Sequence, residues 1–370
     1  MTYLLLAIAA AALAYQAVAL VAALRHLARR ECPSGFSPPV SMLKPVHGLD
    51  PHFYEGIRSQ ALQNYPDFEI LFGVSDRADP AISEIERLAA EFPERTIRLL
   101  EVSTRAPNGK VGLLAELARA ARHAVLVVND SDIRVPPDYL RRVVAPLEDP
   151  RVGVVTCLYR GRAEGWPGRI EAVGIATDFT PGALVAPLVG VSEFGLGATL
   201  VFRVGDLERA GGFAAIADYL PDDYLLSRRI RDLGLKVVVS TLAVETWLGD
   251  RTWGEVWRHQ LRWARTIRVS RGGGYKGLWV THATFWALAL GAAGWWWAAA
   301  PLFAMRLAAG LAAAVALGDR RTLRDFYLVP LRDLWGVALW ACGLFGSEVE
   351  WRGLRLRLDR EGRIVEVRRT

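Results

Sequence analysis

The chain opens with an unbroken apolar run, and several more follow residue 277. Residues 4–24 (LLLAIAAAALAYQAVALVAAL) are long enough to cross a bilayer as a helix, which takes about 20 apolar residues. Arg25, Arg29 and Arg30 follow this run and no basic residue precedes it, whereas a secretory signal carries its positive charge first. The pattern predicts a transmembrane anchor over residues 1–25, with the N-terminus outside and the chain entering the cytoplasm from residue 30 onward. A buried helix of a soluble protein is the alternative.

Between residues 38 and 250, short apolar runs alternate with amphipathic stretches. The Pro-containing segment 31–39 predicts a linker into this region. Strands are expected at 40–43, 69–74, 97–102 and 124–128, and helices at 51–63, 80–92, 110–122 and 222–233. The run 124–128 is apolar throughout, as in a parallel strand covered on both faces. The order of strands and helices predicts a doubly wound α/β domain over residues 38–250.

Aromatic and basic residues mix in the region 251–277. Trp253, Trp257 and Leu261 recur at helical spacing, which predicts a helix lying in the membrane interface. This arrangement would hold the α/β domain against the bilayer surface.

The last region, 278–370, contains three apolar runs and a basic tail. Residues 278–300 predict a spanning helix, and residues 301–317 predict a second one that returns to the cytoplasmic side. The run 334–346 is too short to span, and a crossing there would place the arginine-rich tail outside. We therefore expect three spans in the whole chain, with 326–346 as a re-entrant or interfacial helix.

Composition agrees with a membrane-attached globular protein. Hydrophobic residues make up 52% of the 370 residues. With the 34 glycines added, the apolar share exceeds the roughly 45–50% of soluble proteins. The net charge is +6, with acids interspersed among the bases, which argues against nucleic acid as a partner. The three cysteines are far apart and form no CxxC, so neither a disulfide framework nor a thiolate zinc site is expected.

Acidic residues follow the predicted strands, where the active residues of doubly wound folds lie. Asp76 and Asp79 follow the strand 69–74, and Asp130 and Asp132 follow 124–128. In an extended chain, one intervening residue puts both members of the second pair on the same side. Such a pair can hold one divalent cation, Mg²⁺ or Mn²⁺, together with a diphosphate. An ordinary acidic turn is the alternative.

Two further motifs lie downstream. In the stretch Tyr219-Leu220-Pro221-Asp222-Asp223, Asp222 is typical of a helix cap and Asp223 is the candidate general base. In HQLRW (259–263), Arg262 is suited to a diphosphate, although a solvated interfacial arginine is the alternative. Gly195 and Gly197 would either let the backbone approach a substrate closely or mark a strand bend.

The ordered set LKPVHGLDP, SDRADP, NDSDIRV, PDDYLL and HQLRWARTIR resembles the ceramide glucosyltransferase family of inverting glycosyltransferases. The stretches NDSDIRVPPDYL and VVTCLYRG are most similar to bacterial hopanoid-biosynthesis glycosyltransferases, and the tail string VEWRGLRLRL also matches. The resemblance implies a GT-A domain, a Rossmann-like fold that binds nucleotide-diphospho-sugars, with transmembrane and interfacial helices. It also implies an integral membrane protein of a bacterial inner membrane, with a cytoplasmic catalytic domain.

The resemblance assigns roles to individual residues. It implies that Asp79, with Asp76 nearby, binds the uridine end of the donor, that Asp130 binds the metal and diphosphate, and that Asp223 is the catalytic base. Asp132 completes the metal pair. Arg262 and Trp263 match the family's (Q/R)xxRW motif, and Lys110 would hold the diphosphate as a point charge. His259 departs from the motif, because Gln or Arg is usual there.

The implied reaction is transfer of a hexose from a UDP-sugar to the hydroxyl of a lipid, with inversion. UDP-glucose with ceramide is the first expectation, and UDP-N-acetylglucosamine with a hopanoid polyol is the alternative. A processive polysaccharide synthase and a polyprenyl-phosphate glycosyltransferase remain rivals, although three spans are few for a polymer channel. A membrane module that binds the nucleotide-sugar without turnover is a further alternative, but Asp130, Asp132 and Asp223 are all present.

Overall fold

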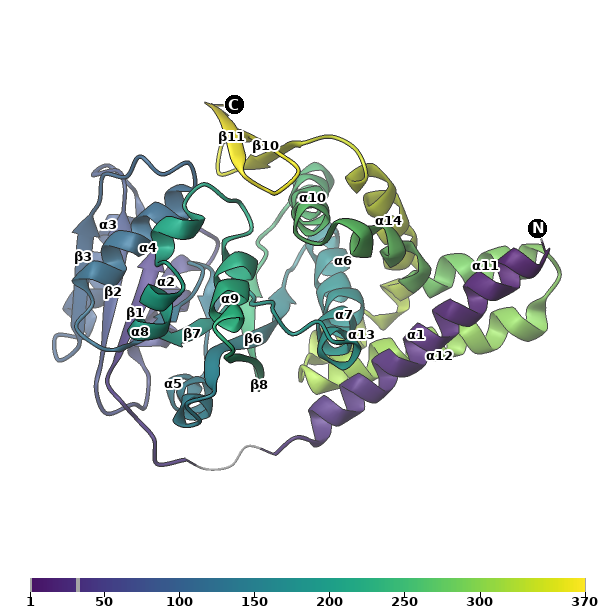
Figure 1. The fold of residues 1–370 in the computed structure, drawn as a ribbon, viewed down its shortest axis with the longest axis horizontal. Coiled ribbons are helices and arrows are strands. Elements are labelled where there is room, and N and C mark those ends of the chain that lie inside the picture. Colours follow the sequence, from purple (N-terminus) through teal and green to yellow (C-terminus); the bar gives the residue numbers. More distant parts are fainter. Residues whose placement is uncertain (1, 31–33, 370) are drawn as a thin grey trace.

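The computed structural model of the chain describes residues 2–30 and 34–369. An α/β domain lies at one end and a group of long apolar helices at the other, and a small sheet lies across the top of the view (Figure 1). Residues 31–33 of the predicted linker, with Cys32, lie outside the described part. The buried Cys157 and the exposed Cys342 are both free.

An eight-stranded sheet forms the centre of the α/β domain, in the order β3-β2-β1-β4-β7-β6-β8-β5. Its strands are β1 Val40–Pro45, β2 Phe68–Val74, β3 Thr96–Glu101, β4 Val125–Val128, β5 Ile133–Arg134, β6 Val152–Arg162, β7 Leu200–Arg203 and β8 Lys236–Trp247. Strands β1 to β4 run parallel to one another, while β7 is antiparallel to both β4 and β6. The parallel half therefore brings the ends of β1, β2 and β4 to one edge.

Helices cover both faces of this sheet. They are α2 Phe53–Ala61, α3 Ala81–Glu91, α4 Gly109–Ala120, α5 Tyr139–Val144, α8 Val204–Arg209 and α9 Asp222–Asp232. Successive residues of a strand point to opposite faces. Met42 accordingly lies in the core beside α2 and α3, while Leu43 lies in the core beside α4 and α9. The four strands and four helices predicted for this domain are confirmed, with boundaries shifted by a few residues.

Three helices are long and apolar enough to cross a membrane, by length and composition, among the residues described. The first is the predicted anchor, α1 Thr2–Ala28, and the third is α12 Trp296–Ala316. The second candidate, Trp166–Val189, was not foreseen. It joins α6 Trp166–Gly174, a π-helical turn Ile175–Phe179, α7 Thr180–Val185 and the 3-10 turn Ala186–Val189. This broken helix is mostly buried, and its middle packs against α1 and α12.

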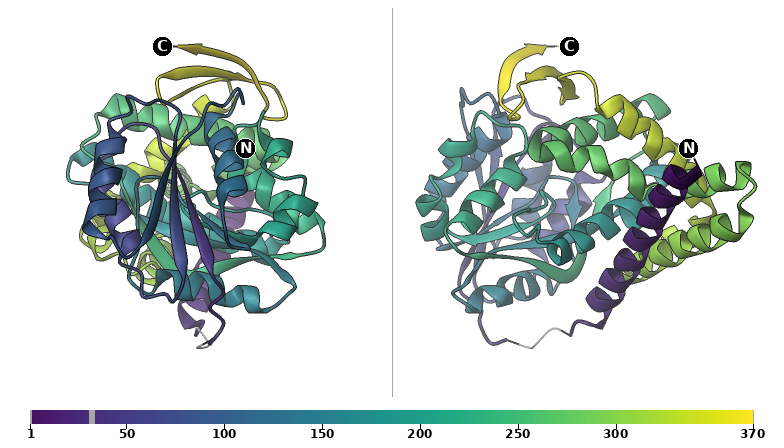
Figure 2. Two further views of the ribbon diagram at one scale, coloured as in Figure 1. Left: turned by 90° about the vertical axis from the view of Figure 1, so that its left-hand side faces the viewer. Right: turned by 45° about the vertical axis from the view of Figure 1, so that its right-hand side comes forward.

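The predicted single span over 278–300 is wrong. The chain there forms a 3-10 turn, Leu278–Thr281, and a short helix, α11 Ala283–Ala292, and then turns back at Gly294 with φ +81°. Glycine adopts this left-handed conformation without steric cost. Helix α12 begins before Pro301, not at it. Helices α11 and α12 pack against α1 (Figure 2).

The predicted interfacial helix is α10 Trp253–Gly277, which starts with a capping box between Thr252 and Glu255. After α13 Arg320–Arg324 comes α14 Val329–Gly343, whose 15 residues are too few to span, as the sequence predicts. The tail then forms a separate antiparallel sheet of β9 Glu348–Trp351, β10 Leu354–Leu358 and β11 Ile364–Arg369. The alternating pattern of β10, Leu-Arg-Leu-Arg-Leu, is that of a half-buried strand.

Candidate functional site

Carboxylates from the end of β4 and the start of α9 meet around one lysine. Lys110 Nζ lies 2.8 Å from Asp130 Oδ1 and 3.1 Å from Asp222 Oδ2. Lys110 stands in the first turn of α4, whose N-terminus is capped by Asn108. Burial lowers the pKa of this ammonium, but the two carboxylates outweigh burial and raise it. Lys110 is therefore a fixed positive charge at the centre of the acidic cluster.

Gly197 brings the backbone into the same cluster. Its N–H donates to Asp223 Oδ2 at 2.8 Å. A Cβ added at this position would lie 3.0 Å from Asp130 Oδ2 and 3.5 Å from both Asp223 Oδ2 and Lys110 Nζ. Close approach of the backbone, and not a simple strand bend, explains the glycine at this position.

Asp223 is a carboxylate held by backbone donors. Besides the bond from Gly197, Asp223 Oδ1 accepts from the N–H of Tyr224 at 2.7 Å. Burial first, and then the nearby charge of Asp222, raise the pKa of Asp223 to about 6. A carboxylate with a raised pKa is a stronger base than an ordinary one, which is the property a general base needs.

Asp130 and Asp132 lie at the turn after β4. Asp132 Oδ2 accepts from Thr246 Oγ1 at 2.5 Å, and the buried Lys44 donates to the backbone carbonyl of Asp130 at 2.7 Å. Burial, and then the charge of Asp130, raise the pKa of Asp132 to about 6. Burial also lowers the pKa of Lys44 to about 7, against the attraction of Asp130 and Asp132.

This pair fits a divalent cation that shares its ligands with a substrate. No group of three or more His, Cys, Asp or Glu side chains with metal-site geometry occurs among the residues described. Asp130 and Asp132 therefore supply two oxygen ligands, and diphosphate and water oxygens would have to supply the rest. After burial, repulsion from Asp130 raises the pKa of Asp132, and a cation bound by the two carboxylates would relieve this repulsion.

The two aspartates after β2 differ in how their oxygens are used. Both Asp79 oxygens accept from the backbone, Oδ2 from Gly48 at 2.8 Å and Oδ1 from Ala81 at 2.9 Å. Asp79 thus ties the loop after β1 to the start of α3. Asp76 is exposed, and among the described residues its carboxylate accepts from Ala78 N alone, through Oδ1. Its second oxygen is free for a ligand in the structure as described.

Arg262 and Trp263 stand side by side on α10 and have different neighbours. The Arg262 guanidinium makes no hydrogen bond or ion pair in the part of the chain that the structure describes. Burial lowers the pKa of this guanidinium, and the charge of Asp130 opposes the shift. Arg262 is therefore a half-buried cation close to the acidic cluster, with no partner for its guanidinium among the described residues.

Trp263 belongs to an aromatic cluster with Tyr159, Phe179 and His259. The ring centroids of Trp263 and His259 are 4.6 Å apart. His259 Nδ1 lies 2.6 Å from Glu171 Oε1, and Arg251 lies 3.3 Å from the other oxygen of the same carboxylate. The departure from the family motif at position 259 thus has a structural partner, Glu171 on α6.

The aromatic cluster connects the acids to the apolar helices. Burial and then the charge of Asp223 raise the pKa of Tyr159. Tyr159 and Phe179 also pack on the apolar cluster formed by α1, α7 and α12, which includes Ala19, Leu184 and Ala313. Tyr159 and Phe179 therefore join the packed apolar core of the long helices to the aromatic cluster around Trp263.

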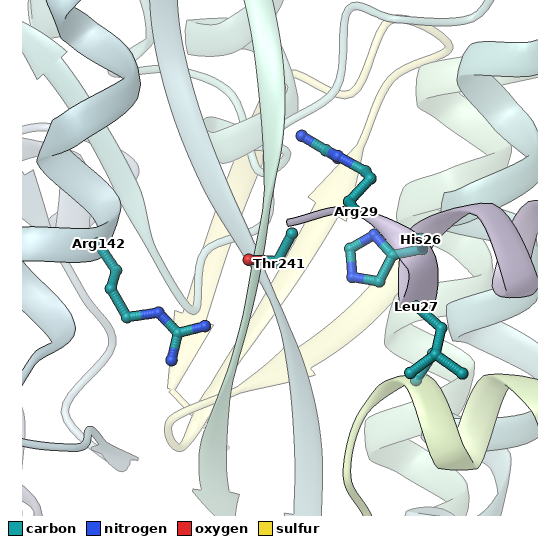
Figure 3. Close-up of a pocket in the computed structure, with 6 residues that line it drawn as sticks. His26, Leu27, Arg29, Arg142 and Thr241 are labelled. Carbon is teal, nitrogen blue, oxygen red and sulfur yellow. The ribbon is translucent and has the colours of Figure 1, made fainter. Parts of the chain in front are cut away.

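A separate cavity of about 320 Å³ lies at the C-terminal end of α1 (Figure 3). It is lined by His26, Leu27, Arg29, Arg142, Thr241 and Ala316. None of the aspartates described above lines this cavity, so it is distinct from the candidate site.

The structure thus brings together Lys110, Asp130, Asp132, Asp223 and Arg262. Lys44, Gly197, Thr246 and Glu171 also contact residues of the predicted site. Of these four, only Gly197 was singled out in the sequence. Lys44 stands inside a buried strand, and a lysine in such a run is a signal that sequence alone offers. Thr246 and Glu171 carry no such signal, because their partners are more than 80 residues away.

A parallel sheet edge with paired carboxylates, a lysine and a half-buried arginine defines, with the fold, a glycosyltransferase of the GT-A type. The chain belongs to glycosyl transferase family 21, whose family model matches residues 4–364. This membership confirms the resemblance found in the sequence motifs.

Curated relatives of the chain are ceramide glucosyltransferases. Ceramide glucosyltransferase 1 of Caenorhabditis elegans is 27% identical over 207 residues, which is 55% of this chain and 44% of the relative. Ceramide glucosyltransferase of Komagataella phaffii is 32% identical over 113 residues, which is 29% of this chain and 22% of the relative. The matches therefore span less than half the length of these relatives.

Among solved structures, a mannosyltransferase of Pyrobaculum calidifontis, PcManGT, in complex with GDP-Man and Mn²⁺, shares the fold. It superposes with a TM-score of 0.58 at 21% identity and covers 92% of this chain and 95% of its own. At this level of identity the likeness concerns the fold alone.

Proposed function

We propose that the protein transfers a hexose from a UDP-sugar to the hydroxyl of a membrane lipid with inversion at the anomeric carbon. Ceramide with UDP-glucose is the first pair of substrates to test, since the curated relatives are named for that reaction. The observation that carries the proposal is the cluster of Lys110, Asp130 and Asp223 in a chain that also has helices apolar enough to cross a membrane, because a lipid hydroxyl needs a base while its tail stays in an apolar environment.

The base is Asp223. It takes the proton from the lipid hydroxyl as that oxygen attacks the anomeric carbon. The backbone N–H groups of Gly197 and Tyr224 hold the carboxylate in place, so that the carboxylate loses little freedom when the acceptor binds. A single base without an enzyme nucleophile gives inversion.

The departing nucleoside diphosphate is received by cations. Lys110 and Arg262 neutralise the charge that builds on the diphosphate as the glycosidic bond breaks. Asp130 and Asp132 would hold Mg²⁺ or Mn²⁺, which when bound supplies further positive charge to the diphosphate oxygens. Mn²⁺ accompanies the nucleotide-sugar in the PcManGT complex, which supports this assignment.

The nucleoside end of the donor lies toward the loop after β2. Asp76 offers a free carboxylate oxygen to the uridine, while Asp79 shapes the loop by holding Gly48 and Ala81. Trp263 and its aromatic neighbours line the acceptor side. The membrane helices and α10 keep the catalytic domain at the bilayer, where lipid head groups are concentrated.

The test is UDP release by the detergent-purified protein. UDP-glucose and UDP-N-acetylglucosamine are crossed with ceramide and a bacteriohopane polyol, each with Mg²⁺, Mn²⁺ or EDTA. The expected result is lipid-dependent, metal-dependent release that falls by about 10²–10⁴ in Asp223→Asn. Asp232→Asn, at the exposed far end of the same helix, is the matched control and is expected to keep wild-type activity.

Different results would reject different parts of the proposal. Equal release by Asp223→Asn would reject the base, and release that needs no lipid would reject the lipid acceptor. Nucleotide binding without turnover on any lipid would instead favour a binding module. Product analysis of the glycolipid by NMR decides between inversion and retention at the anomeric carbon.

A further inference from the structure

The turn between β9 and β10 carries a long basic side chain in an unfavourable backbone conformation. Trp351 pairs with Leu354, so Arg352 and Gly353 form a two-residue hairpin turn. Both have positive φ, 52° for Arg352 and 72° for Gly353. Such turns favour Asn-Gly or Asp-Gly, because a residue with a bulky side chain is strained at positive φ. An arginine held there points to a functional demand on its side chain.

The C-terminal sheet is fixed in place over the site, so that this turn has a defined position (Figure 2). The loop just before the base residue pairs with it, through Leu220 N to Gly362 O at 3.0 Å and Ile364 N to Asp218 O at 2.7 Å. From α10, Arg268 donates to the carbonyl of Leu344 at 2.6 Å, just before β9. The sheet therefore contacts the elements that carry both Asp223 and Arg262.

Arg352 reaches from this turn into the acidic cluster. Its guanidinium donates to both oxygens of Asp50, at 3.1 and 3.0 Å, and to the carbonyl of His47 at 2.7 Å. It also lies 3.3 Å from the hydroxyl of Ser131, the residue between the two predicted metal ligands. These contacts use the terminal N–H groups; the Nε–H has no partner among the described residues, and a third of the side chain is accessible.

The charges around the cluster would allow a diphosphate to bind together with a divalent cation. Five carboxylates and four cations converge there: Asp50, Asp130, Asp132, Asp222 and Asp223, and Lys44, Lys110, Arg262 and Arg352. Burial lowers the pKa of Arg352, but the charges of Asp50, Asp132 and Asp130 outweigh burial and raise it. The charge of Arg352 in turn adds to burial in lowering the pKa of Arg262. A diphosphate between the two guanidinium groups would relieve their mutual repulsion.

We propose that Arg352 is a second arginine of the donor site, which binds the diphosphate of the nucleotide-sugar together with Arg262. Asp50 holds the guanidinium beside the Asp130–Asp132 turn, so its charge is in position before the donor arrives. This inference rests on the proposed use of a nucleotide-diphospho-sugar. It gives the C-terminal sheet a role in the reaction beyond covering the catalytic domain.

The experiment compares binding of UDP and of uridine to the detergent-purified full-length protein by calorimetry, with Mg²⁺ or Mn²⁺ and with EDTA. Arg352→Gln is expected to weaken UDP binding about tenfold or more, the effect of losing a hydrogen bond to a charged group. Uridine, which lacks the diphosphate, is expected to bind Arg352→Gln within about twofold of wild type. Arg352→Lys, which keeps the charge and loses the planar fork, is expected to lie between.

Asp50→Asn distinguishes a role of Arg352 in donor binding from a role in holding the C-terminal sheet. It breaks the ion pair that positions the turn but keeps the guanidinium, so UDP affinity is expected to fall less than in Arg352→Gln, and uridine affinity is expected to stay within about twofold of wild type. If Asp50→Asn and Arg352→Gln lose UDP and uridine affinity alike, Arg352 only holds the sheet and the proposal is overturned. Arg355→Gln, on the same sheet and paired with Glu350 at 3.4 Å, is the matched control and is expected to bind UDP as wild type does.

The outcome also distinguishes this inference from the proposed function. If the wild-type protein binds GDP and not UDP, the same variants are compared with GDP and guanosine, and the role of Arg352 is tested unchanged. Wild-type affinity for UDP in Arg352→Gln would overturn the inference and leave the proposed reaction intact. A wild-type protein that binds no nucleoside diphosphate at all would reject both.

Discussion

His259 and the buried Glu171 form a pair that connects α10 to α6. His259 Nδ1 lies 2.6 Å from Glu171 Oε1, the Glu171 side chain is fully buried, and Arg251 contacts its other oxygen. Because the glutamate has no access to water, the imidazole must donate to it or leave a carboxylate oxygen unsatisfied. The same imidazole packs against Trp263, so the pair also fixes the tryptophan of the HQLRW motif.

We predict that His259→Ala destabilises the protein by about 1–3 kcal/mol, the cost of leaving a buried group without its partner. His259→Gln should cost less, because its amide can still donate to Glu171. Thermal unfolding in detergent measures both variants. His123→Ala, whose imidazole lies 3.9 Å from the exposed Asp67, is the control. Equal losses for His259→Ala and His259→Gln would show that the bond to Glu171 contributes little.

The raised pKa of Asp223 predicts an acid limb in the rate profile. A general base acts only when ionised, and burial and Asp222 raise its pKa to about 6. Below that pH the protonated fraction grows, so kcat/KM should fall about tenfold per pH unit, and above it the rate should level off. Initial rates of UDP release between pH 4.5 and 8.5 test this prediction. A flat profile down to pH 5 would mean that the free enzyme's base titrates lower, or is another residue.

Gly197→Ala should impair the reaction without unfolding the protein. The added methyl group would lie 3.0 Å from Asp130 Oδ2, so the carboxylate or the backbone must shift by a few tenths of an ångström. Small displacements of reacting groups are costly, and we expect a loss of about tenfold to a hundredfold in kcat/KM. The thermal midpoint should change little. Gly205→Ala, where a Cβ meets nothing within 4 Å, is the matched control. Full activity of Gly197→Ala would show that the acidic cluster is not held tightly.

The parallel half of the sheet was predictable because its strands are continuous apolar runs flanked by amphipathic helices. The acids of the site were predictable for a related reason, since Asp130 and Asp132 directly follow one of those runs. The break near Gly294 was not, because the run 278–300 contains only apolar and small residues besides Thr281, His282 and Thr284, and a turn among them leaves the hydropathy unchanged. The pairing of Arg352 with Asp50 was not predictable either: both residues lie in strings that match the family, but neither string indicates that the two side chains meet across 302 residues.

A buried ion pair joins Arg306 on α12 to Asp333 on α14. Arg306 Nη2 lies 2.6 Å and Nε 2.9 Å from the two Asp333 oxygens, and both side chains are at most 3% exposed. Thr284 on α11 also donates to Asp333, so three helices meet at this carboxylate.

Removing one partner leaves the charge of the other unpaired in an apolar environment. Arg306→Met and Asp333→Leu should therefore each destabilise the protein by about 3–5 kcal/mol, whereas the double variant should recover most of that loss. Arg321→Met, on the exposed side of α13, is expected to leave stability unchanged. Denaturation midpoints in one detergent compare the four variants. If the double variant is as unstable as the sum of the single ones, the two charges do not depend on each other, and the helices are held by their apolar contacts alone.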